Sequence, residues 1–343
     1  MSPSRLLRVL VLLGKGDLPP ENAEGIDLES VQWGLEYDVI SNLKKMGHEV
    51  VILEVEQDLL AINKCVDEWK PHVAFNLLEG FGGVALFDQN VISYLEILDV
   101  PYTGCNPRGL MVSRNKALAK KVLAYHGIST PIFETFAKTQ TITKRPLLTF
   151  PVFVKSLTEE SSAGISAASI VNDQDELEAR VKFIHEKVGS DALAEAYIKG
   201  RELYVGIIGN QRLEAFPVWE LHFGDEKEPN IATEKLKSDF EYRKKQKIQT
   251  GPANLNPALE ARAQDMARQS CRVLGVNGYA RVDFRLAENG SLYVLEVNAN
   301  PHIGHYEDFA RSAESKGTTY HELLARILSL GMRWEPEKMS AAT

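Results

Sequence analysis

The stretch GYARVDFRLAENGSLYVLEVNANP, residues 278–301, constrains the fold more tightly than any other part of the chain. Two runs of alternating apolar residues flank Asn289-Gly290, and this pair is a strong β-hairpin signal because both residues tolerate positive φ. A two-residue loop at this pair predicts one apolar face for the two strands. That face would hold Ala280, Val282, Phe284 and Leu286 opposite Ala299, Val297, Leu295 and Tyr293.

The same register gives the hairpin a second, charged face. Asp283 would oppose Glu296, and Arg281 would oppose Asn298, whereas a longer loop would shift these pairs. Opposed like charges destabilise a sheet, so something should compensate the two carboxylates. One candidate is a hard divalent cation, which prefers carboxylate and amide oxygens. The other is a structural cluster in which Arg281 or Arg285 neutralises the pair.

Size, charge and cysteine content restrict the class of protein. The length of 343 residues allows two or three domains with a substantial core. The net charge of −8 argues against nucleic acid as the main partner. Cys65, Cys105 and Cys271 have no metal-ligand spacing, which suits ordinary thiols in a reducing compartment.

The apolar run in MSPSRLLRVLVLLGKGD, at the N-terminus, is short and has no small-residue cleavage site after it. A buried parallel strand that ends at Gly14 explains it better than a signal peptide does. No run in the sequence is long enough to cross a membrane. We therefore expect a cytoplasmic protein with no membrane partner.

Strands and helices alternate through the first hundred residues. The pattern predicts strands at 7–13, 49–55 and 72–80, and helices at 31–46, 58–69 and 88–98. This alternation is typical of a parallel α/β sheet, and loops at the carboxyl ends of such strands commonly form ligand sites.

The rest of the chain lacks this regular alternation. Besides the hairpin, the sequence predicts strands at 151–156, 166–171, 192–198 and 201–208, and helices at 113–126, 173–188, 257–274 and 319–330. Residues 222–256 are polar and rich in Lys and Glu, which indicates a loop.

Four segments resemble, in order, the motifs of the ATP-grasp superfamily and its D-alanine–D-alanine ligase-like group. They are PYTGCNPRGLMVSRNKALAKKVLAYHGISTP (101–131), FPVFVKSLTEESSAGIS (150–166), ALAEAYIKGRELYVGIIGN (192–210) and the hairpin. The resemblance implies an α/β fold with ATP-grasp architecture. Its three units would be an N-terminal parallel-sheet domain at 1–107, a central subdomain with a Ser/Gly loop at 108–200, and a C-terminal subdomain with the metal and catalytic residues at 201–335.

The resemblance also implies which residues would bind the adenine of ATP. Glu195 would hold the base through its side chain, and Tyr197 and Ile198 through their backbone. Phe153 and Leu295 would sandwich the ring. Both apolar residues are core candidates as well, and the two interpretations are compatible.

The ribose and the phosphates would be bound by charged side chains. The resemblance gives Glu202 the ribose hydroxyls and gives Lys155 and Lys116 the phosphates, which suit a compact ammonium group. A further phosphate-binding lysine would be Lys237. Lys235 competes with it, and a solvated charge run is the plain alternative.

Two catalytic residues follow from the resemblance. In the small-residue loop 160–164, Ser161 would lie near the acceptor amine, and Ser162 would help to cover ATP; a flexible connector is the plain alternative. Arg281 would stabilise the oxyanion of a tetrahedral intermediate. The implied reaction is a ligation: a carboxylate attacks the γ-phosphate, and an amine then displaces phosphate from the acyl phosphate.

The metal ligands implied by the resemblance are Asp283, Glu296 and Asn298. They would bind two Mg²⁺ ions, for which Mn²⁺ is a substitute. Mg²⁺ usually takes a few protein oxygens together with substrate phosphates, which agrees with two carboxylates and one amide.

The parts specific for D-alanine do not match. The departures are Glu79 in place of histidine, Asn115 in place of aspartate, Ser156 in place of proline, and NPHIGHYE at 300–307 in place of a glycine-rich turn. The N-terminal acidic substrate residue would be Glu29 or Glu36. Glu79 would suit a cationic amine, or it is a solvated surface residue. We therefore expect a different carboxylate, a different amine, or both.

The sequence thus predicts an ATP- and Mg²⁺-dependent carboxylate–amine ligase of small molecules. One alternative is a nucleotide-binding protein without turnover, but its metal ligands would be lost, and all three are present. Another is an ATP-grasp carboxylase or kinase-like enzyme that phosphorylates a metabolite. We expect a homodimer only because members of the family are often dimers.

Overall fold

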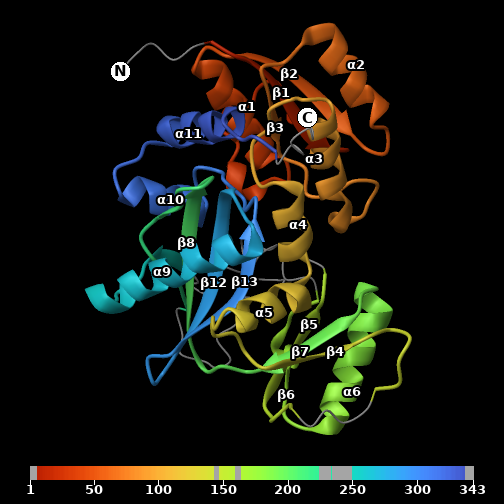
Figure 1. Ribbon diagram of the computed structural model, residues 1–343, viewed down its shortest axis with the longest axis vertical. Helices are drawn as coiled ribbons and strands as arrows, with labels where there is room; N and C mark the ends of the chain where they lie inside the picture. The colour runs from red at the N-terminus through yellow and green to blue at the C-terminus, as the bar shows by residue number, and fades with distance from the viewer. Residues whose placement is uncertain (1–5, 143–146, 159–163, 224–232, 234–248, 337–343) are drawn as a thin grey trace, which may run out of the picture.

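The computed structural model describes residues 6–142, 147–158, 164–223, 233 and 249–336, and these ranges contain three β-sheets. Figure 1 shows the sheet of β1–β3 at one end of the molecule and the sheet of β4–β7 at the other. The sheet that contains β8, β12 and β13 lies between them. The predicted boundaries at 107/108 and 200/201 stay predictions.

The N-terminal sheet is parallel, with the strand order β2-β1-β3, as the alternation predicts. Its elements are β1 (Arg8–Gly14), η1 (Leu28–Ser30), α1 (Gly34–Lys45), β2 (Glu49–Val55), α2 (Leu60–Trp69), β3 (Val73–Asn76), η2 (Ala85–Phe87) and α3 (Asp88–Ile97). Helix α1 begins three residues later than predicted. The chain before it forms the 3-10 turn η1 instead. In this turn the Glu29 N–H donates a hydrogen bond to the Asp27 side chain.

The helix predicted at 113–126 begins too early, because a second helix that was not predicted ends where it was expected to start. The two helices are α4 (Pro107–Arg114) and α5 (Lys116–Tyr125). Asn115 separates them with an extended backbone, and its side chain accepts a hydrogen bond from the Leu118 N–H at 3.0 Å. Asn therefore supplies the helix cap that the aspartate of the family pattern would supply.

The sheet of the central part of the sequence, which we call the central sheet although it lies at one end of the molecule, is antiparallel. Its strand order is β4-β7-β5-β6. Its elements are β4 (Phe133–Phe136), β5 (Val152–Ser156), η3 (Ala167–Ser169), β6 (Ile170–Val171), α6 (Gln174–Phe183), the π-helical turn η4 (Ile184–Val188) and β7 (Ala192–Ala196). The predicted strands at 151–156 and 192–198 are confirmed. The sequence did not predict β4, and the strand expected at 166–171 is reduced to two residues after a 3-10 turn.

The C-terminal sheet is antiparallel, with the order β11-β10-β8-β12-β13 and β9 paired to β8. Its strands and covering helices are β8 (Gly200–Gly209), β9 (Glu214–Ala215), β10 (Trp219–His222), β11 (Gln249–Pro252), α9 (Pro257–Leu274), β12 (Gly278–Ala287), β13 (Leu292–Ala299), α10 (Asp308–Ser315) and α11 (Tyr320–Met332). The loop predicted at 222–256 is wrong at 249–252, where β11 pairs with β10. Most of the remaining loop lies outside the described residues.

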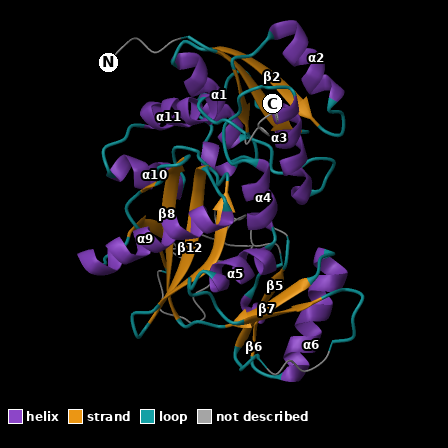
Figure 2. Ribbon diagram, in the orientation of Figure 1, coloured by secondary structure: helices purple, strands orange, loops and turns teal. Residues whose placement is uncertain are grey.

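The buried hydrophobic residues form separate clusters, and two of the three sheets share a cluster. Leu10 and Leu12 of β1 belong to the same buried cluster as Val282 and Phe284 of β12. Helix α11 packs against both β3 and β12, and Figure 2 shows it beside α1. The central sheet has a separate cluster around Phe136. The N-terminal and C-terminal sheets are therefore joined through a common core, whereas the central sheet buries its own.

The thiols and the helices agree with two further expectations. Cys65, Cys105 and Cys271 are all free. Across the described part of the chain, each helix is too short or too polar to span a bilayer.

Candidate active site

The register at the charged end of the hairpin is confirmed. Asp283 opposes Glu296, and Arg281 opposes Asn298. The route to this register differs from the prediction, because the loop has three residues, 288–290, and the Ala287 N–H bonds the Ser291 carbonyl at 2.9 Å. A β-bulge farther along the strand cancels the shift that the longer loop causes.

The bulge places Leu295 on the charged face. Phe284 pairs with Val294, and Asp283 pairs with Glu296, so Leu295 has no partner on β12. Val294 and Val297 are buried, whereas Leu295 and Glu296 are both half-buried. The predicted core positions of Leu295 and Tyr293 are therefore wrong, because the bulge turns Leu295 out of the apolar face and Tyr293 pairs with Arg285 on the charged face.

Three neighbouring strands build this charged face. Across β8 and β12, Tyr204 opposes Asp283, and Glu202 opposes Arg285. The Tyr204 hydroxyl donates to Glu202 at 2.9 Å, and Arg285 lies 3.4 Å from the same carboxylate. Glu202 is thus held in a fixed position, as a ribose-binding carboxylate requires.

Arg281 and Asp283 form a two-point ion pair on this face. The Arg281 Nε and Nη2 lie 2.7 and 2.9 Å from the Asp283 carboxylate oxygens, and the guanidinium lies over the Tyr204 ring at 4.7 Å. Burial opposes the charge of Arg281, but Asp283 outweighs it and raises the pKa of Arg281 well above its ordinary value. Arg281 therefore neutralises one of the two opposed carboxylates. Its ion pair with Asp283 is compatible with either of the two compensations that the sequence left open.

The oxygen atoms at the site fit a Mg²⁺ ion. The described residues contain no group of three or more His, Cys, Asp or Glu that could hold a metal, but Mg²⁺ needs only one or two carboxylates plus substrate oxygens. The Asn298 amide donates to Asp283 at 3.0 Å and approaches Glu296 at 3.5 Å. Rotation of this amide would present its oxygen beside both carboxylates.

The central sheet contributes a buried charged cluster. The Glu195 carboxylate lies 2.7 Å from Lys120 and 3.0 Å from Lys155. Burial alone would raise the pKa of Glu195, but the two lysines outweigh it and hold this pKa below its ordinary value. Phe153 opposes Glu195 across β5 and β7, so the predicted adenine residues of this sheet share one face.

Lys120 is a buried member of this cluster that sequence reasoning missed. It is 1% exposed, and burial lowers its pKa to about 8. Its ammonium also donates to Thr130 at 2.8 Å, and Thr130 donates to the Val294 carbonyl at 2.9 Å. Lys120 thus links Glu195 to the bulged strand. The available signal was its place one helical turn after Lys116, on the alanine-rich face of α5.

The two sheets meet at Lys155. Its ammonium lies 4.0 Å from Glu296, so the predicted phosphate-binding lysine and a predicted metal ligand approach each other from different sheets. Lys116 is buried at the start of α5, and its N–H donates to the Leu157 carbonyl, directly after β5. The Tyr197 N–H already donates to the Pro151 carbonyl at 3.1 Å, so this backbone donor is in use.

Several predicted residues cannot be placed, and others lie at a different end of the site. Ser161, Ser162, Lys237 and its competitor Lys235 lie outside the described residues. Of the acidic candidates, Glu36 is buried in α1, Glu29 is half-buried and Glu79 is exposed. They belong to the N-terminal unit, away from the central sheet.

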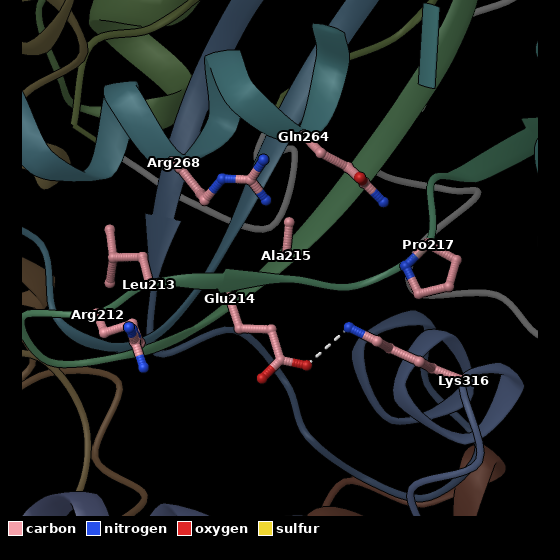
Figure 3. A pocket seen from close by; sticks show the side chains of 8 residues that line it. All are labelled: Arg212, Leu213, Glu214, Ala215, Pro217, Gln264, Arg268 and Lys316. Carbon is pink, nitrogen blue, oxygen red and sulfur yellow. Dashed lines mark hydrogen bonds and ion pairs between the residues drawn. The ribbon is translucent and has the colours of Figure 1, made fainter. Parts of the chain in front are cut away.

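One cavity of about 610 Å³ lies elsewhere on the C-terminal unit. Its lining consists of Arg212, Leu213, Glu214, Ala215, Pro217, Gln264, Arg268 and Lys316. Figure 3 shows Glu214 and Lys316 pointing toward each other, and their charged atoms are 2.7 Å apart. None of the described site predictions lies in this lining, so the cavity is not the ATP site that the sequence predicts.

Comparison with known proteins identifies the family of the chain. The family described as D-ala D-ala ligase C-terminus matches residues 122–329. The D-alanine–D-alanine ligase of Syntrophotalea carbinolica is 32% identical over 293 residues, which cover 84% of this chain and 87% of the relative. An uncharacterised protein of Sinorhizobium fredii is 31% identical over 304 residues, 86% of each chain.

Comparison with solved structures identifies the same family. The D-alanine–D-alanine ligase of Bacillus anthracis complexed with ATP matches with a TM-score of 0.74 at 26% identity. The match covers 95% of this chain and 98% of that one. The chain therefore belongs to the D-alanine–D-alanine ligase family and is an ATP-dependent, ADP-forming carboxylate–amine ligase with the ATP-grasp fold.

Proposed function

We propose that this ligase binds ATP between the central and C-terminal sheets, activates a small-molecule carboxylate as an acyl phosphate and transfers the acyl group to an amine. The observation that carries this proposal is the 4.0 Å approach of Lys155 to Glu296. It brings a cation from one sheet and a carboxylate from the other to one point, where a triphosphate and its counter-ions would both be needed.

The nucleotide would be bound mainly by the central sheet. Phe153 and Leu295 would cover the two faces of adenine, with Glu195 at its edge. Lys155 and Lys116 would pair with the phosphates, whose charge the compact ammonium groups match. Because Lys120 also pairs with Glu195 at 2.7 Å, that carboxylate would keep a cationic partner when Lys155 turns toward a phosphate.

Catalysis would depend on the C-terminal sheet. Asp283, Glu296 and Asn298 would hold two Mg²⁺ ions, which neutralise phosphate charge during transfer when they are bound. Arg281 would donate hydrogen bonds to the oxyanion that forms when the amine attacks the acyl carbonyl. No nucleophile from the protein is required, because the substrate carboxylate attacks the γ-phosphate itself.

The substrates need not be two D-alanine molecules, although that is the reaction in the names of the relatives. Glu79 and the segment 302–306 depart from the pattern that the resemblance implies, whereas the candidate residues for ATP outside the 222–256 segment follow it more closely. A different carboxylate or amine is therefore part of the proposal.

The deciding experiment measures phosphate and ADP release from ATP and Mg²⁺ with pairs drawn from a panel of amino acids and small acids. We expect release that requires both a carboxylate and an amine, with a new C–N bond in the product. Asp283→Asn should abolish this release. Release that needs one acid alone and yields a stable phosphorylated product would favour the kinase-like alternative, and unchanged turnover of Asp283→Asn would refute the site.

Two further parts of the proposal are location and assembly. The free thiols and the need for ATP support a cytoplasmic location. A homodimer stays a prediction, which sedimentation of the purified chain would test.

A further inference from the structure

The cavity of about 610 Å³ on the C-terminal unit has no role in the reaction described so far. Its volume is within the range of small-molecule pockets, about 300–1,000 Å³. Three parts of the chain form its wall: the β8–β9 turn together with β9, helix α9, and the residue that follows α10. A hollow of this size, built by elements that the reaction does not use, has room for a second ligand.

The lining of this cavity carries an excess of positive charge. Among the described residues that line it, Arg212, Arg268 and Lys316 are cationic, and Glu214 is anionic. Figure 3 shows Arg212 and Lys316 on opposite sides of Glu214. The chain as a whole has a net charge of −8, so three cations against one carboxylate run against its average. The cavity therefore has the charge of an anion-binding site.

Two of the three cations have carboxylate partners, but these partners leave the excess unchanged. Lys316 lies 2.7 Å from Glu214. Arg326, which is outside the lining, lies 2.5 Å from the other oxygen of the same carboxylate. Arg268 pairs with Asp265, which is also outside the lining. Because Arg326 and Asp265 add one charge of each sign, the cavity and its surroundings keep the same surplus of cations.

The third cation, Arg212, has no carboxylate partner among the residues that the structure describes. It is exposed and lies in the turn between β8 and β9. The turn is tight, since Gly209 has a φ of +137° and a Cβ at this position would collide with the Arg212 carbonyl oxygen. A turn that depends on glycine thus fixes the backbone of Arg212 at the cavity, and the N–H donors of its guanidinium remain available.

The walls that carry these cations are fixed to each other. Gln264 of α9 donates to the Phe216 carbonyl at 3.1 Å, and α9 packs against β8 and β9. Ala215 pairs with Ile207 across β9 and β8, and both residues are buried. The framework of the cavity therefore exists without a ligand, which lowers the entropic cost of binding one.

We propose that this cavity binds a small molecule with a phosphoryl group, at a site separate from the ATP site. A phosphate monoester carries about two negative charges near pH 8, which match the surplus of cations in the lining. Guanidinium groups bind phosphate oxygens through parallel N–H···O bonds, and an ammonium group adds a compact charge. The inference holds whichever carboxylate and amine the ligase joins.

The test measures binding to the full-length protein by calorimetry at about pH 8 and low ionic strength, where screening of exposed charges is weak. The probes are inorganic phosphate, glycerol 3-phosphate and succinate. The first two distinguish a free phosphate ion from a phosphate ester, and succinate is a dianion without a phosphoryl group. We expect at least one of the two phosphoryl probes to bind, and to bind more tightly than succinate.

Arg212→Gln locates the binding in the cavity. It removes the cation without a described carboxylate partner, so it breaks none of the ion pairs above and should weaken binding of the phosphoryl probe about tenfold. Arg262→Gln is the matched control, because Arg262 is exposed on α9 and lies outside the lining. It removes the same charge and should change binding by less than about twofold.

Glu214→Gln should act in the opposite direction. It removes the negative charge from the described lining and frees Lys316, so the probe should bind about threefold to tenfold more tightly. The two ion pairs of Glu214 are partly exposed, so their loss should cost little stability.

Four results overturn the inference. They are no binding of either phosphoryl probe at up to about 10 mM, tighter binding of succinate, equal losses in Arg212→Gln and Arg262→Gln, and binding to Glu214→Gln that is no tighter than to the unaltered protein.

Discussion

The central and the C-terminal sheets each bring a glutamate to Lys155, and the two glutamates are held differently. Glu195 is 3% exposed and has two lysines at 2.7 and 3.0 Å. The Glu296 side chain is 23% exposed, and the same Lys155 is 4.0 Å away. The carboxylate of Glu195 has two lysines within hydrogen-bond distance and is almost fully buried, whereas Glu296 is more exposed and lies farther from the lysine that both glutamates share. The first arrangement maintains the structure, and the second suits a carboxylate that completes its environment with a ligand.

The largest expected effect comes from Glu296→Gln. We expect turnover to fall by about 10²- to 10³-fold or more, because a metal-binding oxygen and its charge are lost. The free energy of unfolding should stay within about 0.5 kcal/mol, since removing one of two opposed carboxylates relieves repulsion. Phosphate release and urea denaturation provide the two measurements. A strongly destabilised protein would show that Glu296 is structural.

Glu195→Gln, in contrast, should strongly lower the free energy of unfolding. It leaves two buried lysines with a neutral partner, so we expect a loss of about 3–5 kcal/mol in the free energy of unfolding. Glu186→Gln is the control, because Glu186 pairs with Lys182 at 3.7 Å with both side chains more than half exposed, and it should change stability by less than about 0.5 kcal/mol. Equal stability of the two variants would remove the distinction between the glutamates.

The separate cores of the two sheets give the next prediction. Phe136→Ala and Phe284→Ala each remove a fully buried ring, and each should cost about 3–5 kcal/mol. Hydrogen exchange should distinguish them. Phe136→Ala should speed exchange in β4–β7 alone, whereas Phe284→Ala should speed it in β1 and β12 together, because these strands share one core. Faster exchange in β1 after Phe136→Ala would contradict the division.

The smallest expected effect is the pH dependence that Glu36 causes. Its folded-state pKa of about 8 lies above its ordinary value, so it stabilises the fold fully below pH 4.5 and loses this contribution as the pH rises through 8. Between pH 7 and 9 the protein should lose about 1 kcal/mol more than Glu36→Gln does. His302 has a pKa of about 4 and does not titrate in this window. Parallel denaturation curves for both proteins across the window would contradict the buried charge of Glu36.

The sequence predicts which charged residues of the hairpin face each other, but not the loop length and the bulge that produce this pairing. Asn289-Gly290 marks the turn, and the repulsion of Asp283 and Glu296 marks the site. The three-residue loop and the bulge at Leu295 cancel each other, so a register drawn without either gives the same pairs for residues 280–283 and wrong pairs between the bulge and the loop. The structure buries Val294 and not Leu295, which distinguishes the bulged hairpin from the regular one. Which of these two residues is buried depends on what the rest of the fold packs against the strand.

Three other differences between the prediction and the structure have separate causes. The caps Asn106 and Asn115 signal two helices where periodicity alone suggested one. The sequence places Lys120 inside the predicted helix 113–126 and gives it no role, because its partner Glu195 is 75 residues away in the chain and only the fold brings them together. Short strands such as β11 and β4 carry too few residues for an alternating pattern to be recognised.

The bulge in β13 has a consequence for how this strand tolerates change. Leu295 is the one residue between Leu292 and Ala299 that lacks a neighbour on β12, so the ladder would close without it. Deleting Leu295 would leave Asp283 facing Glu296 and take away the apolar side chain that we propose covers adenine. Deleting Val294 would also restore a regular ladder, but Leu295 would then take its place opposite Phe284 in the core. Leu295 is therefore a residue whose loss changes the charged face of the hairpin without repacking the core.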